Sequence, residues 1–200
     1  IKTKKECDSG TDRIASEIHK LMDLAWGENS LKWEKQTSRK RFEQTLIINV
    51  QGDQPFIDPK IISKLIDEFK KSEKKARVIT PIYKLNSKKI HDPNIVKVIL
   101  NKNLNAIYFS RSPIPFIRDK NPDEWGNFSN FWGHVGVYGY RADVLRIWRK
   151  MLVSKYEVLE GLEQLRLINE DIVIKTFKID SDVLSVDTID NLIEARAKIK

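Results

Sequence analysis

The sequence has little cysteine and no long apolar run. A single cysteine, Cys7, cannot form an internal disulfide, which favours a reducing, cytoplasmic compartment. No set of His and Cys residues with zinc-ligand spacing is present. No run approaches the ~18 apolar residues of a membrane-spanning helix, so we expect no membrane insertion. The first residues are polar and basic, so no secretory signal peptide is predicted.

Several common functional motifs are also missing. Gly133, Gly136 and Gly139 lie three residues apart, but no Gly-Lys-Ser/Thr follows them, so they do not form a P-loop. The sequence has no serine nucleophile elbow and no RNA-binding signature with interleaved aromatic residues. These absences exclude the commonest nucleotide-hydrolysing and esterase classes.

The charge is basic but dispersed. The net charge is +8, because 36 Lys and Arg residues outnumber 28 Asp and Glu residues. A basic balance can indicate nucleic acid, an anionic surface or a polyanionic substrate. Because the lysines are spread along the chain, we interpret them as a solvated surface and expect no nucleic-acid partner. A nucleic-acid-binding module is the alternative of a different class, and its affinity would depend on salt.

Short apolar runs alternate with helical patterns through the 200 residues. This alternation predicts one α/β domain over 1–200, with a mostly parallel sheet flanked by helices and a smaller hairpin or lid. Strands are expected over 46–50, 77–82, 95–100, 106–110, 133–141 and 172–179. Helices are expected over 11–24, 59–69, 142–152 and 157–169, and again from 187 or 188.

Two segments of the sequence show no hydrophobic periodicity. The segment 26–44 is polar and charged, and we expect a long surface connection that is partly disordered. The segment 111–132 contains Pro113, Pro115 and Pro122. We interpret it as a loop or lid that is mobile without ligand and becomes ordered over a bound sugar.

Polar residues follow the apolar run 46–50 directly. Ligands bind at the carboxyl ends of strands in open α/β sheets. Gly52 permits close backbone approach, Asp53 offers a hard oxygen ligand for Mg²⁺, and Gln51 can read a base edge or a sugar hydroxyl. A turn in which Asp53 bonds backbone amides explains the same residues equally well.

Two further motifs have a structural and a functional interpretation. Asp187 is a second strand-end carboxylate, but it is also well placed to cap the last helix. The segment 9–13 (SGTDR) opens a helix, where free amides bind anions, although Thr11 as an ordinary cap fits the spacing at least as well. His134 alone is more often structural than functional. The helix 157–169 is expected to place Leu159, with Leu162 and Leu165, inward and its acidic residues in solvent.

Taken together, these motifs resemble the 3-deoxy-manno-octulosonate (Kdo) cytidylyltransferases, or CMP-Kdo synthetases. Each block is weak alone, but the ordered set is specific and covers nearly all of the chain. The matching blocks are 9–13 (SGTDR), 49–55 (NVQGDQP), 107–111 (IYFSR), 114–115 (IP), 134–141 (HVGVYGYR), 162–166 (LEQLR) and 186–188 (VDT).

The resemblance implies a nucleotide-diphospho-sugar-transferase-like α/β fold and a homodimer. It implies transfer of CMP from CTP to Kdo, with release of pyrophosphate, for lipopolysaccharide biosynthesis. Asp53 and Asp187 match the catalytic carboxylates that hold Mg²⁺. The nucleotide-binding positions match Ser9, Gly10, Thr11, Arg13 and Gln51. The sugar-binding positions match Arg111, His134, Tyr138, Glu163 and Gln164.

The sequence departs from the family pattern in three places. Nothing matches the family's N-terminal phosphate-binding loop, so we expect little or no catalysis by this chain alone. Gln54 stands where the family usually has Glu, and the segment 26–44 is longer than the usual connection. Two alternatives therefore stay open: a cytidylyltransferase for a related acidic sugar, such as amino-Kdo or sialic acid, and an inactive nucleotide- or sugar-binding paralogue.

Overall fold

The computed structural model describes residues 1, 3, 6–72, 76–180, 183–186 and 188–199. The strands are β1 (Leu46–Val50), β2 (Val78–Lys84), β3 (Lys97–Leu100), β4 (Ala106–Ser110), β5 (Trp132–His134), β6 (Val137–Arg141) and β7 (Ile174–Ile179). The α-helices are α1 (Gly10–Ser16), α2 (Ile18–Trp26), α3 (Lys35–Gln44), α4 (Pro59–Lys71), α5 (Trp125–Phe128), α6 (Ala142–Trp148), α7 (Lys155–Glu160), α8 (Leu165–Asn169) and α9 (Ile189–Ile199). Short 3₁₀ turns occupy Ser30–Lys32, Ser87–Lys89 and Pro122–Glu124.

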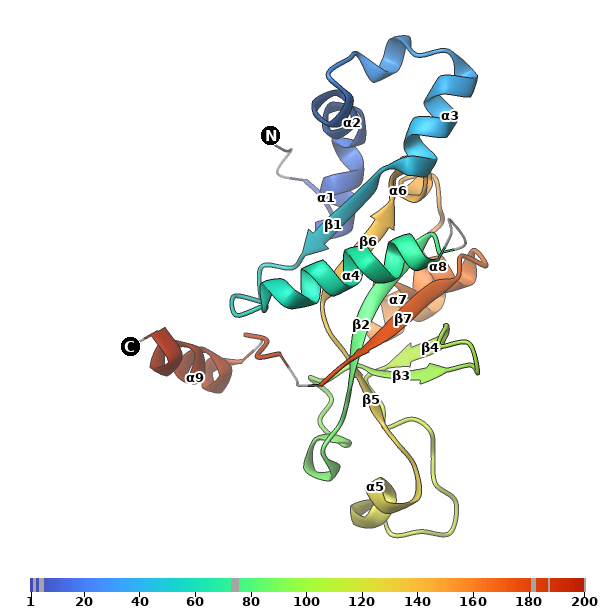
Figure 1. The fold of residues 1–200 in the computed structure, drawn as a ribbon. Helices are drawn as coiled ribbons and strands as arrows, with labels where there is room; N and C mark the ends of the chain where they lie inside the picture. Colours follow the sequence, from blue (N-terminus) through green and yellow to red (C-terminus); the bar gives the residue numbers. More distant parts are fainter. Residues whose placement is uncertain (2, 4–5, 73–75, 181–182, 187, 200) are drawn as a thin grey trace.

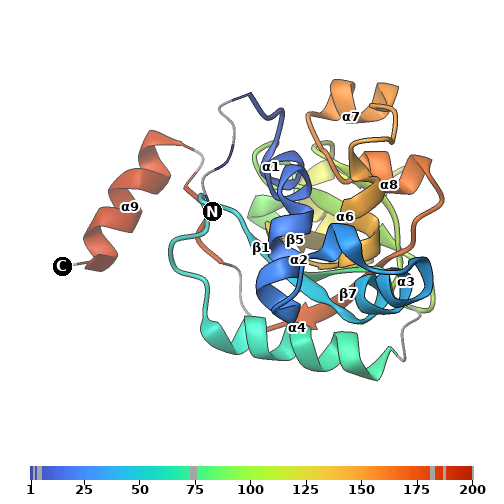
Figure 2. The ribbon, with the colours of Figure 1, turned by 90° about the horizontal axis from the view of Figure 1, so that it is seen from above.

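One seven-stranded sheet organises the chain, in the order β1-β6-β2-β5-β3-β4 with β7 beside β2 (Figure 1). Helices cover both faces of the sheet: α4 lies along one face, while α1, α2, α6 and α8 lie on the other (Figure 2). Each face has its own apolar cluster. Met22 and Trp148 are fully buried on the side of α1 and α6, and Leu65 is fully buried under α4. The predicted α/β class with flanking helices is confirmed.

The prediction of a mostly parallel sheet is wrong. Among the described strands only β2 and β7 pair in parallel, and the other pairings are antiparallel. The prediction failed because continuous apolar runs such as 46–50 report burial on both faces and not strand direction. Nevertheless, β1, β2 and β7 run in the same direction, since β1 and β2 are both antiparallel to β6 and β7 is parallel to β2. The carboxyl ends of β1 and β7 therefore meet at one edge.

Local sequence signals set several element boundaries correctly. Helix α4 begins after Asp58, whose Oδ1 accepts from the Lys60 backbone amide at 2.8 Å, with Pro59 at the first helical position. β1 occupies the predicted residues, and β3 and β4 form the predicted antiparallel hairpin. Three predicted long elements are each divided. The helix over 11–24 is interrupted at Glu17, between α1 and α2. The helix over 157–169 breaks at Gly161, which has a φ of 62°, and the strand over 133–141 is interrupted after His134.

The segment 26–44 is not the irregular connection that we predicted, because it contains the ten-residue helix α3. Phe42 alone forms the apolar side of α3, and it is fully buried. The Arg146 guanidinium stacks on the Phe42 ring at 4.6 Å, and the Arg41 guanidinium lies 4.6 Å from the centre of the Trp33 ring. Because cation–π contacts replace apolar neighbours here, the helix shows no hydrophobic period in the sequence.

The predicted lid 111–132 contains a buried anchor. Trp125 in α5 is 3% exposed and stacks on Phe131, with ring centres 6.2 Å apart. Its indole N–H donates to the Lys120 carbonyl at 3.2 Å. Outside the segment, the centre of the Trp125 ring lies 5.2 Å from that of the His91 ring, and the Leu85 amide donates to the Phe131 carbonyl at 2.8 Å. The segment is therefore attached to residues 85–91, and its mobility without ligand stays a prediction.

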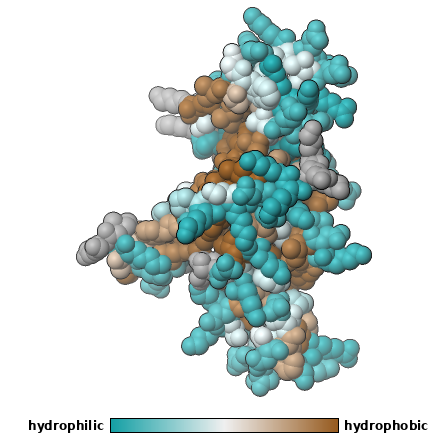
Figure 3. All heavy atoms as spheres, in the orientation of Figure 1, coloured by the Kyte–Doolittle hydropathy of each residue, from teal (hydrophilic) through white to brown (hydrophobic). Residues whose placement is uncertain are grey.

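Helix α9 stands apart from the rest of the fold (Figures 1 and 2). Polar side chains dominate the face seen in Figure 3, and apolar atoms gather at its centre, around β1. Within the described residues, no helix combines the length and the apolar character that crossing a membrane requires.

Candidate active site

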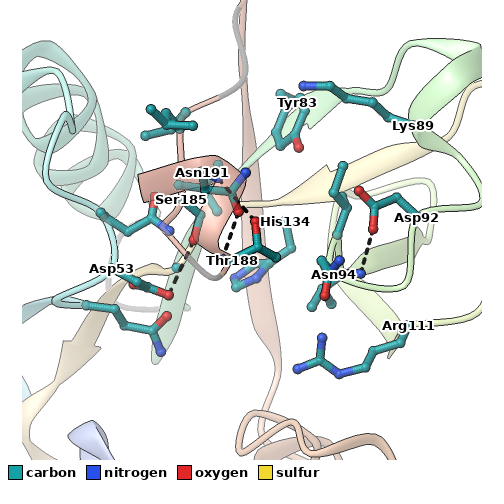
Figure 4. Close-up of a pocket in the computed structure, with 18 of the residues that line it drawn as sticks. Asp53, Tyr83, Lys89, Asp92, Asn94, Arg111, His134, Ser185, Thr188 and Asn191 are labelled. Atoms are coloured by element: carbon teal, nitrogen blue, oxygen red, sulfur yellow. Dashed lines mark hydrogen bonds between the residues drawn. The ribbon is translucent and has the colours of Figure 1, made fainter. Parts of the chain in front are cut away.

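A cleft of about 680 Å³ opens at the edge where β1 and β7 end. Its walls come from the loop after β1, the break between β5 and β6, the segment 92–96, Arg111, the junction of α7 and α8, and the segment leading into α9. Figure 4 shows Asp53 and Ser185 on one side of the cleft and Arg111, Asp92 and Asn94 on the other, with His134 between them. Polar groups from segments far apart in the sequence thus face one space.

The loop after β1 is joined to the segment after β7. The Val186 amide donates to the Asp53 carbonyl at 2.9 Å, and the Ser185 hydroxyl donates to Asp53 Oδ2 at 3.4 Å. The Gln51 amide donates to the Gly136 carbonyl at 3.2 Å, which ties the same loop to the break between β5 and β6. The expected convergence of the two strand ends is therefore present. Asp187 itself lies outside the described residues.

The donors at this edge suit a hard cation. The Asp53 carboxylate lines the cleft beside the hydroxyl of Ser185 and the amide oxygen of Gln51. No group of three or more His, Cys, Asp or Glu gathers in the described part of the chain to form a closed metal site. Mg²⁺ commonly uses one or two carboxylates and takes its other ligands from water and substrate phosphates. Asp53 fits such an open site.

His134 is a neutral hydrogen-bonding group. Burial lowers the pKa of His134 to about 3, so the imidazole carries no charge at pH 7. Thr80 Oγ1 lies 3.0 Å from His134 Nε2 and has the Val137 carbonyl as an acceptor at 2.8 Å. Because the single hydroxyl proton of Thr80 goes to a carbonyl, Nε2 carries the ring proton and Nδ1 is left as an acceptor. His134 can therefore accept from a sugar hydroxyl but cannot neutralise an anion.

Glu163 lines the cleft, and its carboxylate is only partly hydrogen-bonded. The Thr11 hydroxyl donates to Glu163 Oε1 at 2.6 Å. Glu163 Oε2 is buried and has no hydrogen-bond partner among the described residues. Tyr138 lies beside His134, with ring centres 5.1 Å apart, and burial raises the pKa of Tyr138 well above its usual value. Tyr138 thus keeps its phenolic proton. A ligand hydroxyl that donates to Glu163 Oε2 would satisfy a buried acceptor.

Arg111 supplies positive charge to the opposite wall. Its Nε donates to the Glu160 carbonyl at 2.9 Å, and one terminal nitrogen donates to the Pro93 carbonyl at 3.1 Å. Its backbone amide donates to Glu160 Oε2 at 2.9 Å. Because its side-chain bonds go to neutral carbonyls, the guanidinium keeps its charge available for a carboxylate.

Comparisons with known proteins agree with this arrangement. The sequence profile described as cytidylyltransferase matches residues 30–178. The 3-deoxy-manno-octulosonate cytidylyltransferase of Fusobacterium nucleatum is 38% identical over 193 residues, which are 96% of this chain and 68% of the relative. The Escherichia coli protein of the same name is 33% identical over 197 residues, covering 98% of this chain and 69% of the relative.

The chain belongs to the 3-deoxy-manno-octulosonate cytidylyltransferase family. A solved structure of CMP:2-keto-3-deoxy-manno-octonic acid synthetase complexed with CTP superposes with a TM-score of 0.79 at 33% identity. The match covers 100% of this chain and 71% of that one. Apo UDP-glucose pyrophosphorylase, at 14% identity and a TM-score of 0.57, shares the fold.

Seven of the predicted site residues line the one cleft of this family member. They are Gln51, Asp53, Arg111, His134, Tyr138, Glu163 and Gln164. Their roles as metal, nucleotide or sugar ligands stay predictions.

The predicted nucleotide residues on α1 do not line the cleft. The Ser9 hydroxyl caps α1 by accepting from the Asp12 amide at 3.1 Å, with Gly10 as the first helical residue. Arg13 donates to the Thr3 hydroxyl at 2.8 Å. Thr11 is fully buried and contacts Glu163. Thr11 therefore supports the cleft residue Glu163 from outside the cleft.

Sequence reasoning also missed cleft residues. Tyr83, Lys89, Asp92 and Asn94 line the wall opposite Asp53 (Figure 4). A polar turn, His91-Asp92-Pro93-Asn94, directly before the apolar run of β3 was the available signal. The inward placement predicted for Leu159 is also wrong, because its side chain is 70% exposed; α7 ends at Gly161, so the periodicity of 157–169 does not continue through one helix.

Proposed function

We propose that this protein transfers CMP from CTP to Kdo, forming CMP-Kdo and pyrophosphate. The observation that carries the proposal is the cleft itself. It has Asp53, after the end of β1, on one side and Arg111 on the other, with His134 between them, and Gln51 and Glu163 line the same cleft. A nucleotide at the end of β1 and an acidic sugar on the opposite wall would lie within reach of each other.

The chemistry places different demands on the two walls. Arg111 binds the carboxylate of the sugar acid, and Glu163 Oε2 and His134 Nδ1 accept from its hydroxyls. The anomeric oxygen attacks the α-phosphorus of CTP in line; a new P–O bond forms, the bond to the β-phosphate oxygen breaks, and the hydroxyl proton is released. Such a step depends on positioning and on neutralising charge more than on covalent catalysis.

We propose that Asp53 and Asp187 hold Mg²⁺ in this reaction. The ion would screen the phosphates and lower the pKa of the attacking hydroxyl. The Asp53 carboxylate, held by the Ser185 hydroxyl, supports the first assignment. The strand-end position of Asp187, one residue after Val186, supports the second.

We also propose a homodimer in the cytoplasm. CTP is a metabolite of that compartment, and the single cysteine fits reducing conditions. Sedimentation of the intact protein tests the dimer.

The activity is tested with the intact protein, CTP, Mg²⁺ and Kdo, by measuring CMP-Kdo and pyrophosphate. We expect both products in equal amounts. A competition between Kdo, amino-Kdo and sialic acid then ranks the acidic sugars, because no described residue contact fixes the sugar's C8 substituent. Absence of product with every acidic sugar would overturn the proposal and favour an inactive paralogue.

A further inference from the structure

Lys97 on β3 is fully buried, although lysine is among the residues least often found in a protein interior. Its Nζ donates to the carbonyls of Asp92 at 2.8 Å, Ile95 at 2.6 Å and Arg111 at 2.5 Å. An ammonium group has three N–H donors, so every donor has a carbonyl acceptor. The side chain makes no ion pair within the described chain.

The three carbonyls belong to two separate segments of the cleft wall. Asp92 and Ile95 lie in the segment 92–96 before β3, and Arg111 follows β4. The Arg111 side chain also contacts the first segment, because it donates to the Pro93 carbonyl at 3.1 Å. Lys97 therefore holds together, from inside the protein, the two segments that carry Arg111 and the polar residues beside it.

We propose that Lys97 is a positioning residue that fixes Arg111 for the carboxylate of the sugar substrate. This inference rests on the proposed function, which assigns that carboxylate to Arg111. A neutral side chain of similar length would fill the space but remove the Lys97 donor from all three carbonyls, of which the Asp92 carbonyl would keep the Ile95 amide at 3.2 Å. The two segments would then separate from β3 toward water, and Arg111 would lose its fixed place.

The test is Lys97→Met in the intact protein, with KM measured separately for Kdo and for CTP. We expect KM for Kdo to rise about tenfold or more while KM for CTP stays within about twofold, because only sugar binding is weakened. Lys64→Met is the matched control. Lys64 Nζ also donates to one backbone carbonyl, that of Lys178 at 2.6 Å, but it lies on α4 outside the cleft.

The unchanged protein provides a second measurement, which does not depend on folding of the variant. Burial lowers the pKa of Lys97 to about 8. The charged groups that face it are Asp92, Arg111 and Glu160. Above pH 8, deprotonation of Lys97 removes one of its N–H donors. KM for Kdo should therefore rise with pH, while KM for CTP should stay constant.

The outcomes separate the two proposals. If the wild-type protein forms no CMP-Kdo, the proposed function fails. If it does, and KM for Kdo is unchanged both in Lys97→Met and in the wild type between pH 7 and 9, only the positioning role of Lys97 fails. An equal rise in the KM values for both substrates would show that Lys97 merely stabilises the fold.

Discussion

The Thr11 hydroxyl donates to Glu163 Oε1 at 2.6 Å, which connects the first turn of α1 with the junction of α7 and α8 across 152 residues of sequence. Thr11 Oγ1 also lies 3.2 Å from the Tyr140 hydroxyl and accepts from Asn49 Nδ2 at 3.3 Å. One oxygen of Glu163, a residue that lines the cleft, is thereby fixed by α1. One helix that does not line the cleft thus orients a residue that does.

Thr11→Val should remove the hydrogen bond between residue 11 and Glu163 with little change in side-chain volume. Glu163 Oε1 loses its donor, so we expect KM for Kdo to rise and the free energy of unfolding to fall by about 1–3 kcal/mol. Thr176→Val is the matched control, because its hydroxyl is also buried but bonds the Leu104 carbonyl at 2.8 Å, outside the cleft. An unchanged KM for Kdo in Thr11→Val would remove the positioning role of Thr11.

His134 should make stability depend on pH. Its pKa is lowered by burial to about 3 in the folded state, against 6.5 in the unfolded chain. The unfolded state therefore binds more protons below pH 6.5, and folding stability is lost as pH falls from 6.5 toward 3. Within this range, His134 contributes a slope of up to about 1.4 kcal/mol per pH unit to the free energy of unfolding.

His134→Gln tests the slope, since it keeps hydrogen-bonding capacity without a titrating ring. Urea unfolding at several pH values between 4 and 7 should show a shallower pH dependence in the variant than in the wild type. Parallel curves would mean that His134 does not carry the effect.

Gly136 leaves room for the Gln51 side chain. A Cβ at Gly136 would lie 2.2 Å from Gln51 Oε1, the far end of a flexible side chain. Gly136→Ala should therefore fold, displace the Gln51 amide and raise KM for CTP. Gly27→Ala, at a helix end with a φ of 67°, should lower stability by about 1 kcal/mol without changing either KM. Normal CTP kinetics in Gly136→Ala would argue against a nucleotide contact by Gln51.

Asp187→Asn separates a helix cap from a metal ligand. Thr188 already caps α9, because its hydroxyl accepts from the Asn191 amide at 3.2 Å while its own amide donates to Asn191 Oδ1 at 3.1 Å. Asn also caps helices about as well as Asp, so thermal melting should stay near wild type. An amide oxygen is a weaker Mg²⁺ ligand than a carboxylate, so turnover should fall by orders of magnitude and the Mg²⁺ requirement should rise. A Mg²⁺ titration with Asp53→Asn alongside provides the comparison. A variant that melts early but turns over normally per folded molecule would show that Asp187 only caps α9.

The parts of the fold that the sequence predicted correctly depend on local rules. Asp58 and Pro59 mark the start of α4 whatever the tertiary context. The short apolar run 46–50 predicted the strand β1, although β1 stands at the end of the strand order and Val50 is 41% exposed. The motif 49–55 likewise identified Gln51 and Asp53, because polar residues at a strand end have a fixed place in an α/β sheet.

The errors concern features that depend on distant neighbours. The sequence did not predict α3 because Phe42 packs against Arg146, which lies 104 positions later in the chain. Such a contact leaves no hydrophobic periodicity in the local sequence. Thr11 was interpreted from its place at a helix start, whereas its role depends on Glu163. Strand direction also depends on the whole topology, which short apolar runs do not encode.

The bond between the Val186 amide and the Asp53 carbonyl also constrains the order of folding. The two loops come together when β7 pairs with β2, and this pairing joins residues 96 positions apart, such as Val78 and Ile174. A folding intermediate with β1 to β6 formed but β7 undocked would have Asp53 in place without its partners. The protein would then acquire affinity for its charged ligands late, so that ligand binding reports on completed folding and not on collapse.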